Sequence, residues 1–175
     1  MKMARWTRFS WDLRNFAPVY PAIDKRYSIR EAAPEDEKGV RTAVVTAFTL
    51  DPHWNTAQFR DRLDAALDLV FNPKANAGRV PCLVITHGAR IIGASAVSSW
   101  REAENHLLTG PCILMEYRNR GLGTALLAHS LLYLKEAELQ IAHGTTLQGT
   151  PTERFLYRKF NSVSAPYDDA PASVA

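Results

Sequence analysis

The hydrophobic residues of the chain follow two spacings, one typical of helices and one typical of strands. Val40, Val44 and Phe48 recur every four residues behind Pro34, so a helix opened by that proline is expected here. Its first turn is acidic, which complements the helix dipole. The same reasoning predicts helices over three further ranges, residues 59–70, 122–136 and 151–160.

Apolar and β-branched runs predict the strands. Residues 80–86 and 90–99 flank His87-Gly88 and indicate a hairpin. Residues 105–115 form the next expected strand, interrupted by Gly110-Pro111. Because proline cannot donate to a sheet ladder, this pair predicts a bulge or an edge. Two shorter strands are expected at residues 27–30 and 141–147.

The first 26 residues carry a pattern of their own. Phe9, Trp11 and Leu13 alternate with polar residues, which predicts a strand added to the sheet, either in its own subunit or in the partner of a homodimer. Trp6, Phe9, Leu13 and Phe16 also fit a helix. Only 15 residues follow Phe160, so at most one further strand fits there.

Length and composition indicate one soluble domain. The chain has 175 residues, of which 46% are hydrophobic and 22% charged. Its apolar runs stay well below the roughly 18 residues of a membrane span. The N-terminus lacks the pattern of a secretory signal, and Cys82 and Cys112 lie in expected strands as buried reduced thiols. We therefore expect a cytoplasmic protein.

The basic character of the chain is confined to its start. Residues 1–30 hold seven basic and two acidic residues, a net charge of +5, which leaves −2 for residues 31–175 out of a total of +3. A nucleic-acid interface needs a basic stripe, and the body of the domain has none. Nucleic acid is therefore not an expected partner.

The segment from Ile113 to Thr124 is the main candidate for a ligand-binding site. An apolar strand end leads through a basic turn to Gly121 and Gly123 and then to a helix. The first N–H groups of a helix have no intrahelical partner, and glycines let an anion approach them. With Arg118 and Arg120 beside them, these groups predict a pyrophosphate site.

The dinucleotide-binding fingerprint is the competing interpretation of the glycines. It needs a third glycine where this chain has Leu126, and an acidic residue about 20 positions further on. Residues 141–148, the expected next strand, contain no carboxylate. The sequence therefore argues against a nicotinamide or flavin dinucleotide.

The pattern resembles motif A of the GNAT superfamily, the acyl-CoA-dependent N-acetyltransferases, whose signature is Arg/Gln-X-X-Gly-X-Gly/Ala. Arg118, Gly121 and Gly123 match it, and the run 113–117 is similar to the family's Val-X-Pro-Glu-Tyr, with Met115 in place of proline. Residues 150–160 resemble the second signature, Asn-X-X-Ala-X-X-Leu-Tyr-X-Lys. The resemblance covers roughly residues 27–161.

This resemblance implies a mixed α/β (α+β) domain over residues 27–161, in the order β-α-α-β-β-β-α-β-α, with an extension at 1–26 and a short strand or tail at 162–175. Its central sheet would be splayed, with the pantetheine arm of acetyl-CoA in the gap. The implied cofactor-binding residues are Ile113, Leu114 and Met115 for pantetheine, Arg118, Asn119, Arg120, Gly121, Leu122, Gly123 and Thr124 for the pyrophosphate, and Thr150, which replaces the family asparagine.

By the same resemblance, Tyr157 is the residue that protonates the CoA sulfur, although it could also simply pack the last helix. Candidates for a general base are Glu102, Glu104, His106, Glu116 and His143, each of which has an ordinary structural explanation. Cys112 has no neighbour in the sequence that would lower its pKa, and no Cys/His cluster has metal-ligand spacing.

The expected function is transfer of an acetyl group from acetyl-CoA to a primary amine, of a small molecule or a peptide, by direct attack. The alternatives are a catalytically silent acyl-CoA sensor on the same scaffold, and a peripheral membrane or partner-docking module that uses the basic N-terminus. The acceptor pocket would be lined by the 48–58 loop with His53 and Trp54, and by the 98–106 connection with Trp100.

Overall fold

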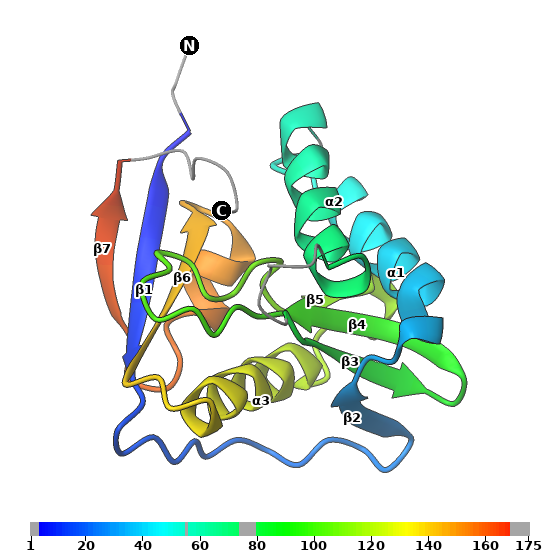
Figure 1. Cartoon of the computed structure of the whole chain (residues 1–175), viewed down its shortest axis with the longest axis horizontal. Helices are drawn as coiled ribbons and strands as arrows, with labels where there is room; N and C mark the ends of the chain where they lie inside the picture. The colour runs from blue at the N-terminus through cyan, green and yellow to red at the C-terminus, as the bar shows by residue number, and fades with distance from the viewer. Residues whose placement is uncertain (1–3, 55, 74–79, 169–175) are drawn as a thin grey trace.

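A computed structural model describes residues 4–54, 56–73 and 80–168, which form two antiparallel sheets with helices around them (Figure 1). The larger sheet has the strand order β2-β3-β4-β5 and the smaller one β6-β1-β7. This is the mixed α/β class that the sequence predicts. The strands of the larger sheet are β2 (Tyr27–Glu31), β3 (Cys82–His87), β4 (Arg90–Ala96) and β5 (Cys112–Ile113).

Helices cover both faces of the larger sheet. A short 3-10 turn, η1 (Pro34–Asp36), leads into α1 (Glu37–Thr49), which packs with α2 (Ala57–Phe71) on one face, where Val84 lies. On the other face, Ile85 contacts the start of α3 (Leu122–Glu136). Neighbouring residues of β3 therefore point to opposite cores, as the pleat of a strand requires.

The segment expected as one strand over residues 105–115 is mostly irregular. Ala94 pairs with Cys112, whereas Val97 bridges to Leu107, so residues 95–96 of one strand face residues 108–111 of the other. The two extra residues form the bulge that Gly110-Pro111 predicts. Gly110 has a positive φ of 63°, and the hydroxyl of Thr109 accepts the N–H of Ala96 at 3.0 Å in place of a strand carbonyl.

The N-terminal segment is a strand and not a helix. β1 (Trp6–Asp12) lies between β6 (Ile141–Leu147) and β7 (Val163–Tyr167) of its own chain. Phe9, Trp11 and Leu13 are almost completely buried. They pack in one core with the C-terminal half of α3, so this helix spans both sheets.

The last helix is shorter than the sequence suggests. Instead of running to Phe160, it is one π-helical turn, η3 (Thr152–Leu156). Phe160 and Asn161 both have positive φ angles, of 62° and 58°, which reverse the chain toward β7. The Trp11 indole donates to the Lys159 carbonyl at 2.9 Å, and this bond to β1 fixes the turn.

Among the described residues, no helix is long and apolar enough to cross a bilayer.

Replacing Trp11 by alanine should lower the free energy of unfolding by about 3–5 kcal/mol, because the indole is wholly buried and its loss leaves a cavity. Urea denaturation measures this change. Arg14→Ala, which removes an exposed side chain near the end of the same segment, is the matched control and should change stability far less. Equal losses in the two variants would contradict the placement of β1 in the core.

Candidate functional site

The N-terminus of α3 offers unpaired backbone donors. Gly121 is the N-cap residue, with a positive φ of 77°, and no side chain caps the helix. The N–H groups of Leu122, Gly123 and Thr124 therefore have no intrahelical acceptor and lie at the positive end of the helix dipole. A Cβ built on Gly123 would meet only Ile113 and Leu156, at 3.9 and 4.0 Å, so the space beside it is open.

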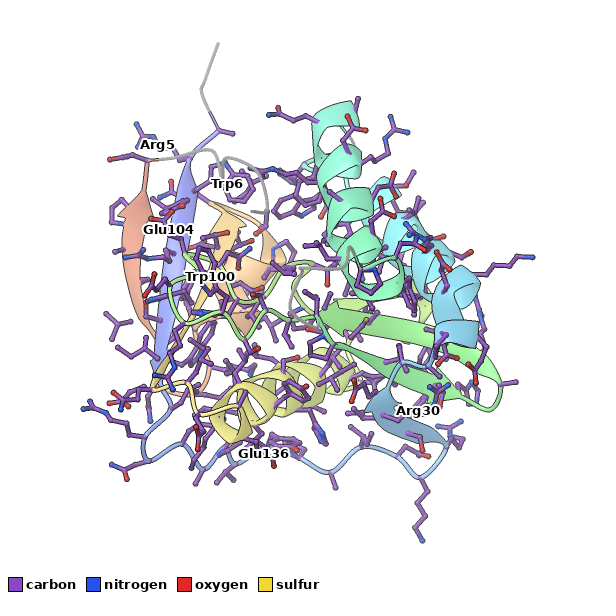
Figure 2. All side chains as sticks on the ribbon, viewed as in Figure 1. Arg5, Trp6, Arg30, Trp100, Glu104 and Glu136 are labelled. Atoms are coloured by element: carbon purple, nitrogen blue, oxygen red, sulfur yellow. The ribbon has the colours of Figure 1, made fainter. Side chains whose placement is uncertain are left out.

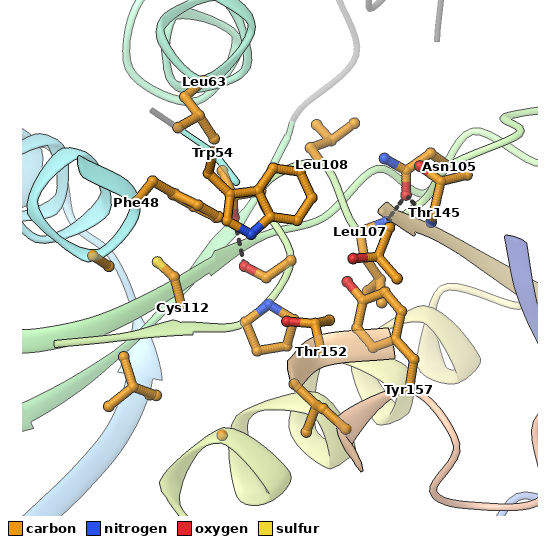
Figure 3. A pocket seen from close by; sticks show the side chains of 18 of the residues that line it. Phe48, Trp54, Leu63, Asn105, Leu107, Leu108, Cys112, Thr145, Thr152 and Tyr157 are labelled. Atoms are coloured by element: carbon orange, nitrogen blue, oxygen red, sulfur yellow. Dashed lines mark hydrogen bonds between the residues drawn. The ribbon is translucent and has the colours of Figure 1, made fainter. Parts of the chain in front are cut away.

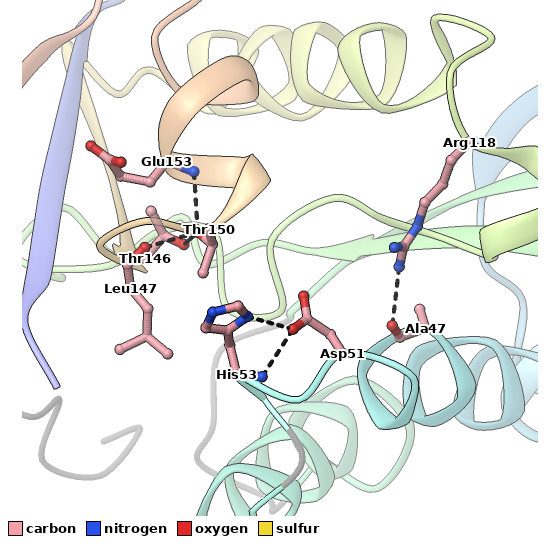
Figure 4. A network of polar contacts seen from close by, with 8 residues as sticks. All are labelled: Ala47, Asp51, His53, Arg118, Thr146, Leu147, Thr150 and Glu153. Atoms are coloured by element: carbon pink, nitrogen blue, oxygen red, sulfur yellow. Dashed lines mark hydrogen bonds and ion pairs between the residues drawn. The ribbon is translucent and has the colours of Figure 1, made fainter.

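The two arginines of the motif are engaged within the protein. Arg118 donates through Nε to the Ile113 carbonyl at 3.0 Å and through Nη2 to the Ala47 carbonyl at 3.1 Å, which lies near the C-terminal end of α1 (Figure 4). Arg120 donates to the Tyr27 hydroxyl and the Glu116 carbonyl. Their first role in this structure is thus to hold the turn before α3 in place.

A cavity of about 1200 Å³ runs from this helix end into the space between β5 and β6 (Figure 3). Four of the proposed cofactor-binding residues, Leu114, Met115, Arg120 and Thr150, do not line it. Those that do are Ile113, Arg118, Asn119, Gly121, Leu122, Gly123 and Thr124, together with Tyr157.

Thr150 is fully buried beside the cavity and uses its hydroxyl locally. The hydroxyl donates to the Leu147 carbonyl at 2.8 Å and accepts the N–H of Glu153 at 3.3 Å (Figure 4). It thereby joins the end of β6 to the start of η3. This is a structural role that the comparison with asparagine at this position did not suggest.

Tyr157 is held by aromatic neighbours with its hydroxyl at the cavity wall. Its ring meets those of Trp11 and Phe9 edge-on, at centroid distances of 5.5 and 5.7 Å. A Cβ on Gly110 would lie 2.7 Å from the hydroxyl oxygen, so the bulge leaves room for that group. Burial raises the pKa of the Tyr157 phenol above its ordinary value, which keeps the proton on the oxygen at neutral pH.

The histidines that the sequence offered as bases form a structural pair. The Nε2 of His106 lies 2.9 Å from the Trp100 carbonyl, to which it must donate, and its Nδ1 accepts the N–H of His143 at 2.8 Å. Burial lowers the pKa of His106 to about 4. His143 lies 2.7 Å through Nδ1 from the Ser10 hydroxyl, and neither ring lines the cavity. His106 therefore fastens the 98–106 connection to β6.

Three carboxylates from the described part of the chain line the cavity. Glu104 accepts a hydrogen bond from the Tyr167 hydroxyl, while Glu102 forms no hydrogen bond or ion pair within the described part of the chain. Asp51, which the sequence analysis did not single out, accepts the N–H of His53 at 2.9 Å (Figure 4). Glu116 is instead paired with Arg90 and lies outside the cavity.

Cys112 lines the cavity as a buried thiol. Its Sγ lies 3.3 Å from the Ala94 carbonyl, and burial raises its pKa to about 11. A thiol with so high a pKa is a poor nucleophile at neutral pH.

The outer part of the cavity has aromatic walls. Trp54 and Trp100 line it as expected, but His53 does not. Figure 2 shows Trp6 at the end of β1, and this residue also lines the cavity, with Phe48 and Phe59. The alternation that predicted β1 gave no signal for Trp6, which lies on the strand face opposite Phe9 and Trp11. Its contact with the α1–α2 region is not encoded in a local pattern.

Comparison with known proteins identifies the family of the chain. Residues 42–161, more than half of the chain, match the model of the acetyltransferase (GNAT) family. The chain belongs to this family. Its members transfer acyl groups and use acetyl-CoA as the donor. None of the curated proteins matches the sequence.

Solved structures share the fold at low identity. A Drosophila protein of 13% identity gives a TM-score of 0.61, and a GCN5-related N-acetyltransferase from Sphaerobacter thermophilus, 16% identical, gives 0.58. Each match covers 94% of this chain and 50% of the other, so the chain spans about half the length of these structures. A GNAT-family protein from Novosphingobium aromaticivorans, described as a putative acetyltransferase, has 14% identity and a TM-score of 0.55, over 93% of this chain and 60% of its own.

The donor set at α3 suits the cofactor of the family. Acetyl-CoA carries a pyrophosphate, and uncapped backbone amides with an open approach at Gly123 are suited to an anion of this kind. The cavity that continues past Ile113 and Cys112 gives room for an elongated arm.

The buried imidazole of His106 should make the fold sensitive to acid. Its pKa in the folded chain, about 4, is below the ordinary 6.5, so the unfolded chain takes up the proton first. Stability should therefore fall as the pH drops from about 6.5 toward 4, by at most about 1.4 kcal/mol per pH unit from this residue. Urea denaturation at a series of pH values measures the slope.

His106→Gln, which cannot titrate, should have a shallower slope. Burial also lowers the pKa of His129 and His143, so His143→Gln serves as the comparison for a less buried ring. An unchanged slope in His106→Gln would refute this role.

Proposed function

We propose that this protein transfers an acetyl group from acetyl-CoA to a primary amine by direct attack. The observation that carries the proposal is that one cavity joins the uncapped amides of α3 to the hydroxyl of Tyr157. An anion-binding helix end and a proton donor therefore open onto the same space. That combination suits the transfer of a group carried on a long phosphorylated cofactor.

The residues at α3 would hold the pyrophosphate. The N–H groups of Leu122, Gly123 and Thr124 supply donors. Arg118 also lines the cavity, and the guanidinium N–H groups that do not bond to the two backbone carbonyls can donate to the phosphate. Arg120 would act indirectly, since its bonds to Tyr27 and Glu116 shape the turn.

The bound cofactor supplies a reactive acetyl thioester. Tyr157 would donate its phenolic proton to the departing sulfur, and the phenolate would regain a proton from water once the thiol has left. The rigid aromatic packing around its ring fixes the direction of the hydroxyl. The proton released by the amine would pass to water or to Glu102, the lining carboxylate whose oxygens are uncommitted among the described residues.

A silent acyl-CoA sensor remains the second candidate. It is favoured by the internal use of the Thr150 hydroxyl and by the absence of a buried base among the described residues that line the cavity. The two functions differ in one assay, release of thiol from acetyl-CoA over a panel of amines, with coenzyme A binding measured in parallel by calorimetry. Binding without turnover on any amine would favour the sensor.

Tyr157→Phe should lower kcat roughly a hundredfold, within the range expected for loss of a general acid, and leave coenzyme A affinity nearly unchanged. Phenylalanine keeps the ring contacts with Phe9 and Trp11, so the variant should fold normally. Steady-state kinetics and calorimetry test both statements. A kcat equal to that of the unmodified protein would mean that Tyr157 only packs the core.

The two glycines of α3 should respond differently to alanine. At Gly121 the positive φ makes a side chain cost about 1–2 kcal/mol of stability. At Gly123 alanine should leave stability equal or higher, yet weaken coenzyme A binding about tenfold because its methyl group enters the approach to the amides. Thermal melts and calorimetry separate the effects.

Gly149→Ala is the matched control for the backbone cost, since Gly149 has a φ of 83° and lies outside the cavity lining. Unchanged coenzyme A affinity in Gly123→Ala would remove the proposed phosphate site.

A further inference from the structure

On the basis of the acetyl transfer proposed above, we infer that the acceptor is a monoamine carried on an aromatic or bulky apolar body, and that the N-terminal strand builds part of its pocket.

Four packed rings line the cavity, and we call them the aromatic wall: Trp6, Phe48, Trp54 and Phe59. Trp54 is at its centre, with ring centroids 5.9 Å from Trp6, 5.8 Å from Phe48 and 4.4 Å from Phe59. All four residues line the cavity. Packed aromatic surface of this kind favours an apolar ligand, because it offers area for burial and edge or face contacts to a ring.

The wall joins parts of the chain that are distant in sequence. Phe48 and Phe59 belong to α1 and α2, which cover the larger sheet, whereas Trp6 starts β1 in the smaller sheet. Trp6 lies before the residues that match the family model. The contact of Trp6 with Trp54 therefore lets a segment outside the matched region shape the acceptor end of the cavity.

Trp100 adds a further ring from the 98–106 connection. The residue is exposed, at 56% of its accessible area, while its carbonyl is fixed by the buried His106. An exposed ring on an anchored backbone can turn onto a ligand without moving the chain. Trp100 is therefore suited to cover an apolar acceptor once it has entered.

The charges at the cavity argue against a polyamine. Among the described residues, three acidic ones line it, Asp51, Glu102 and Glu104, and three basic ones, Arg62, Arg118 and Lys159, so the formal charge of this part of the lining is zero. Arg62 also lies over the ring of Trp6, 5.4 Å from its centroid, and so brings a cation to the wall already. A ligand with several ammonium groups would find no excess of negative charge among these described residues.

An apolar wall also suits the chemistry of a single amine. Attack on a thioester needs the neutral amine, and burial against aromatic rings disfavours the charged ammonium form. Glu102 lines the same cavity, and its oxygens, which have no partner among the described residues, can take the departing proton. The wall thus selects the body of the acceptor and promotes its reactive form.

The test compares phenethylamine and tryptamine with ethanolamine, spermidine and a lysine-containing peptide as acceptors, following thiol release from acetyl-CoA. The two aryl amines should show kcat/KM roughly tenfold to a hundredfold higher than ethanolamine, as expected from burial of one ring. Higher values for ethanolamine, spermidine or the peptide would overturn the inference and leave acetyl transfer standing.

Trp100→Ala and Trp6→Ala should reduce the preference for aryl amines about tenfold while the affinity for coenzyme A stays the same. Because Trp100 is exposed, Trp100→Ala should fold normally, and a thermal melt checks that Trp6→Ala is folded. Val163→Ala, on the exposed β7 and outside the cavity, is the control and should keep the preference. A preference that survives in Trp100→Ala and in a folded Trp6→Ala would overturn the role of the rings.

A second readout separates this inference from the proposed function. If no amine is turned over although coenzyme A binds, acetyl transfer fails. Quenching of tryptophan fluorescence by phenethylamine in the presence of coenzyme A, and its absence with ethanolamine, would then still support the apolar pocket. Equal responses to both amines would remove it.

Discussion

The separation of β5 from β6 is the constraint on which the rest of the site depends. The segment 108–111 is two residues longer than residues 95–96, the segment that faces it. Gly110 and Pro111 lie in this longer segment, where the ladder between β4 and its neighbour would otherwise continue. The sheet therefore divides, and the cavity lies in the division with Cys112 and Ile113 on one side and Thr145 and Thr146 on the other. Backbone groups freed from pairing become available to line a site.

A divided sheet needs something to hold its halves together. On one side of the division, His106 performs this task, because its backbone and ring both bond to the backbone of His143 on β6. Beneath the sheets, α3 packs its first turns on the larger sheet and its later turns on the smaller one. Its amide-bearing end therefore cannot shift relative to the cavity without disturbing both cores.

Much of this fold was predictable from the sequence, because its signals are local. The apolar spacing after Leu122 gives α3 its observed bounds, and the run 141–147 gives β6. The length of the strand over 105–115 was overestimated. The two extra residues that interrupt it are defined only by its pairing with β4, which the sequence of one segment does not reveal. The length of the last helix was overestimated for a similar reason, because a hydrogen bond from the distant Trp11 fixes the turn that follows the helix.

The site was predictable in part. Gly121, Gly123 and Tyr157 belong to local sequence motifs and line the cavity, and their roles in binding and catalysis stay predictions. The bonds of Arg118 to the end of α1, the paired histidines and the contribution of Trp6 all join residues far apart in the chain. The spacing of residues along the chain does not predict such contacts. They determine which polar groups stay available to bind a ligand or to transfer a proton.

The central position of β1 also has a consequence for synthesis. Ser10 meets His143 and Trp11 meets Lys159 at sequence separations of 133 and 148 residues, so the middle strand of the small sheet leaves the ribosome long before either neighbour. Until β6 and β7 emerge, Phe9, Trp11 and Leu13 have no core to enter, and pairings of such long range form slowly. The nascent chain therefore carries an unpaired hydrophobic strand until residues 141–167 have been synthesised.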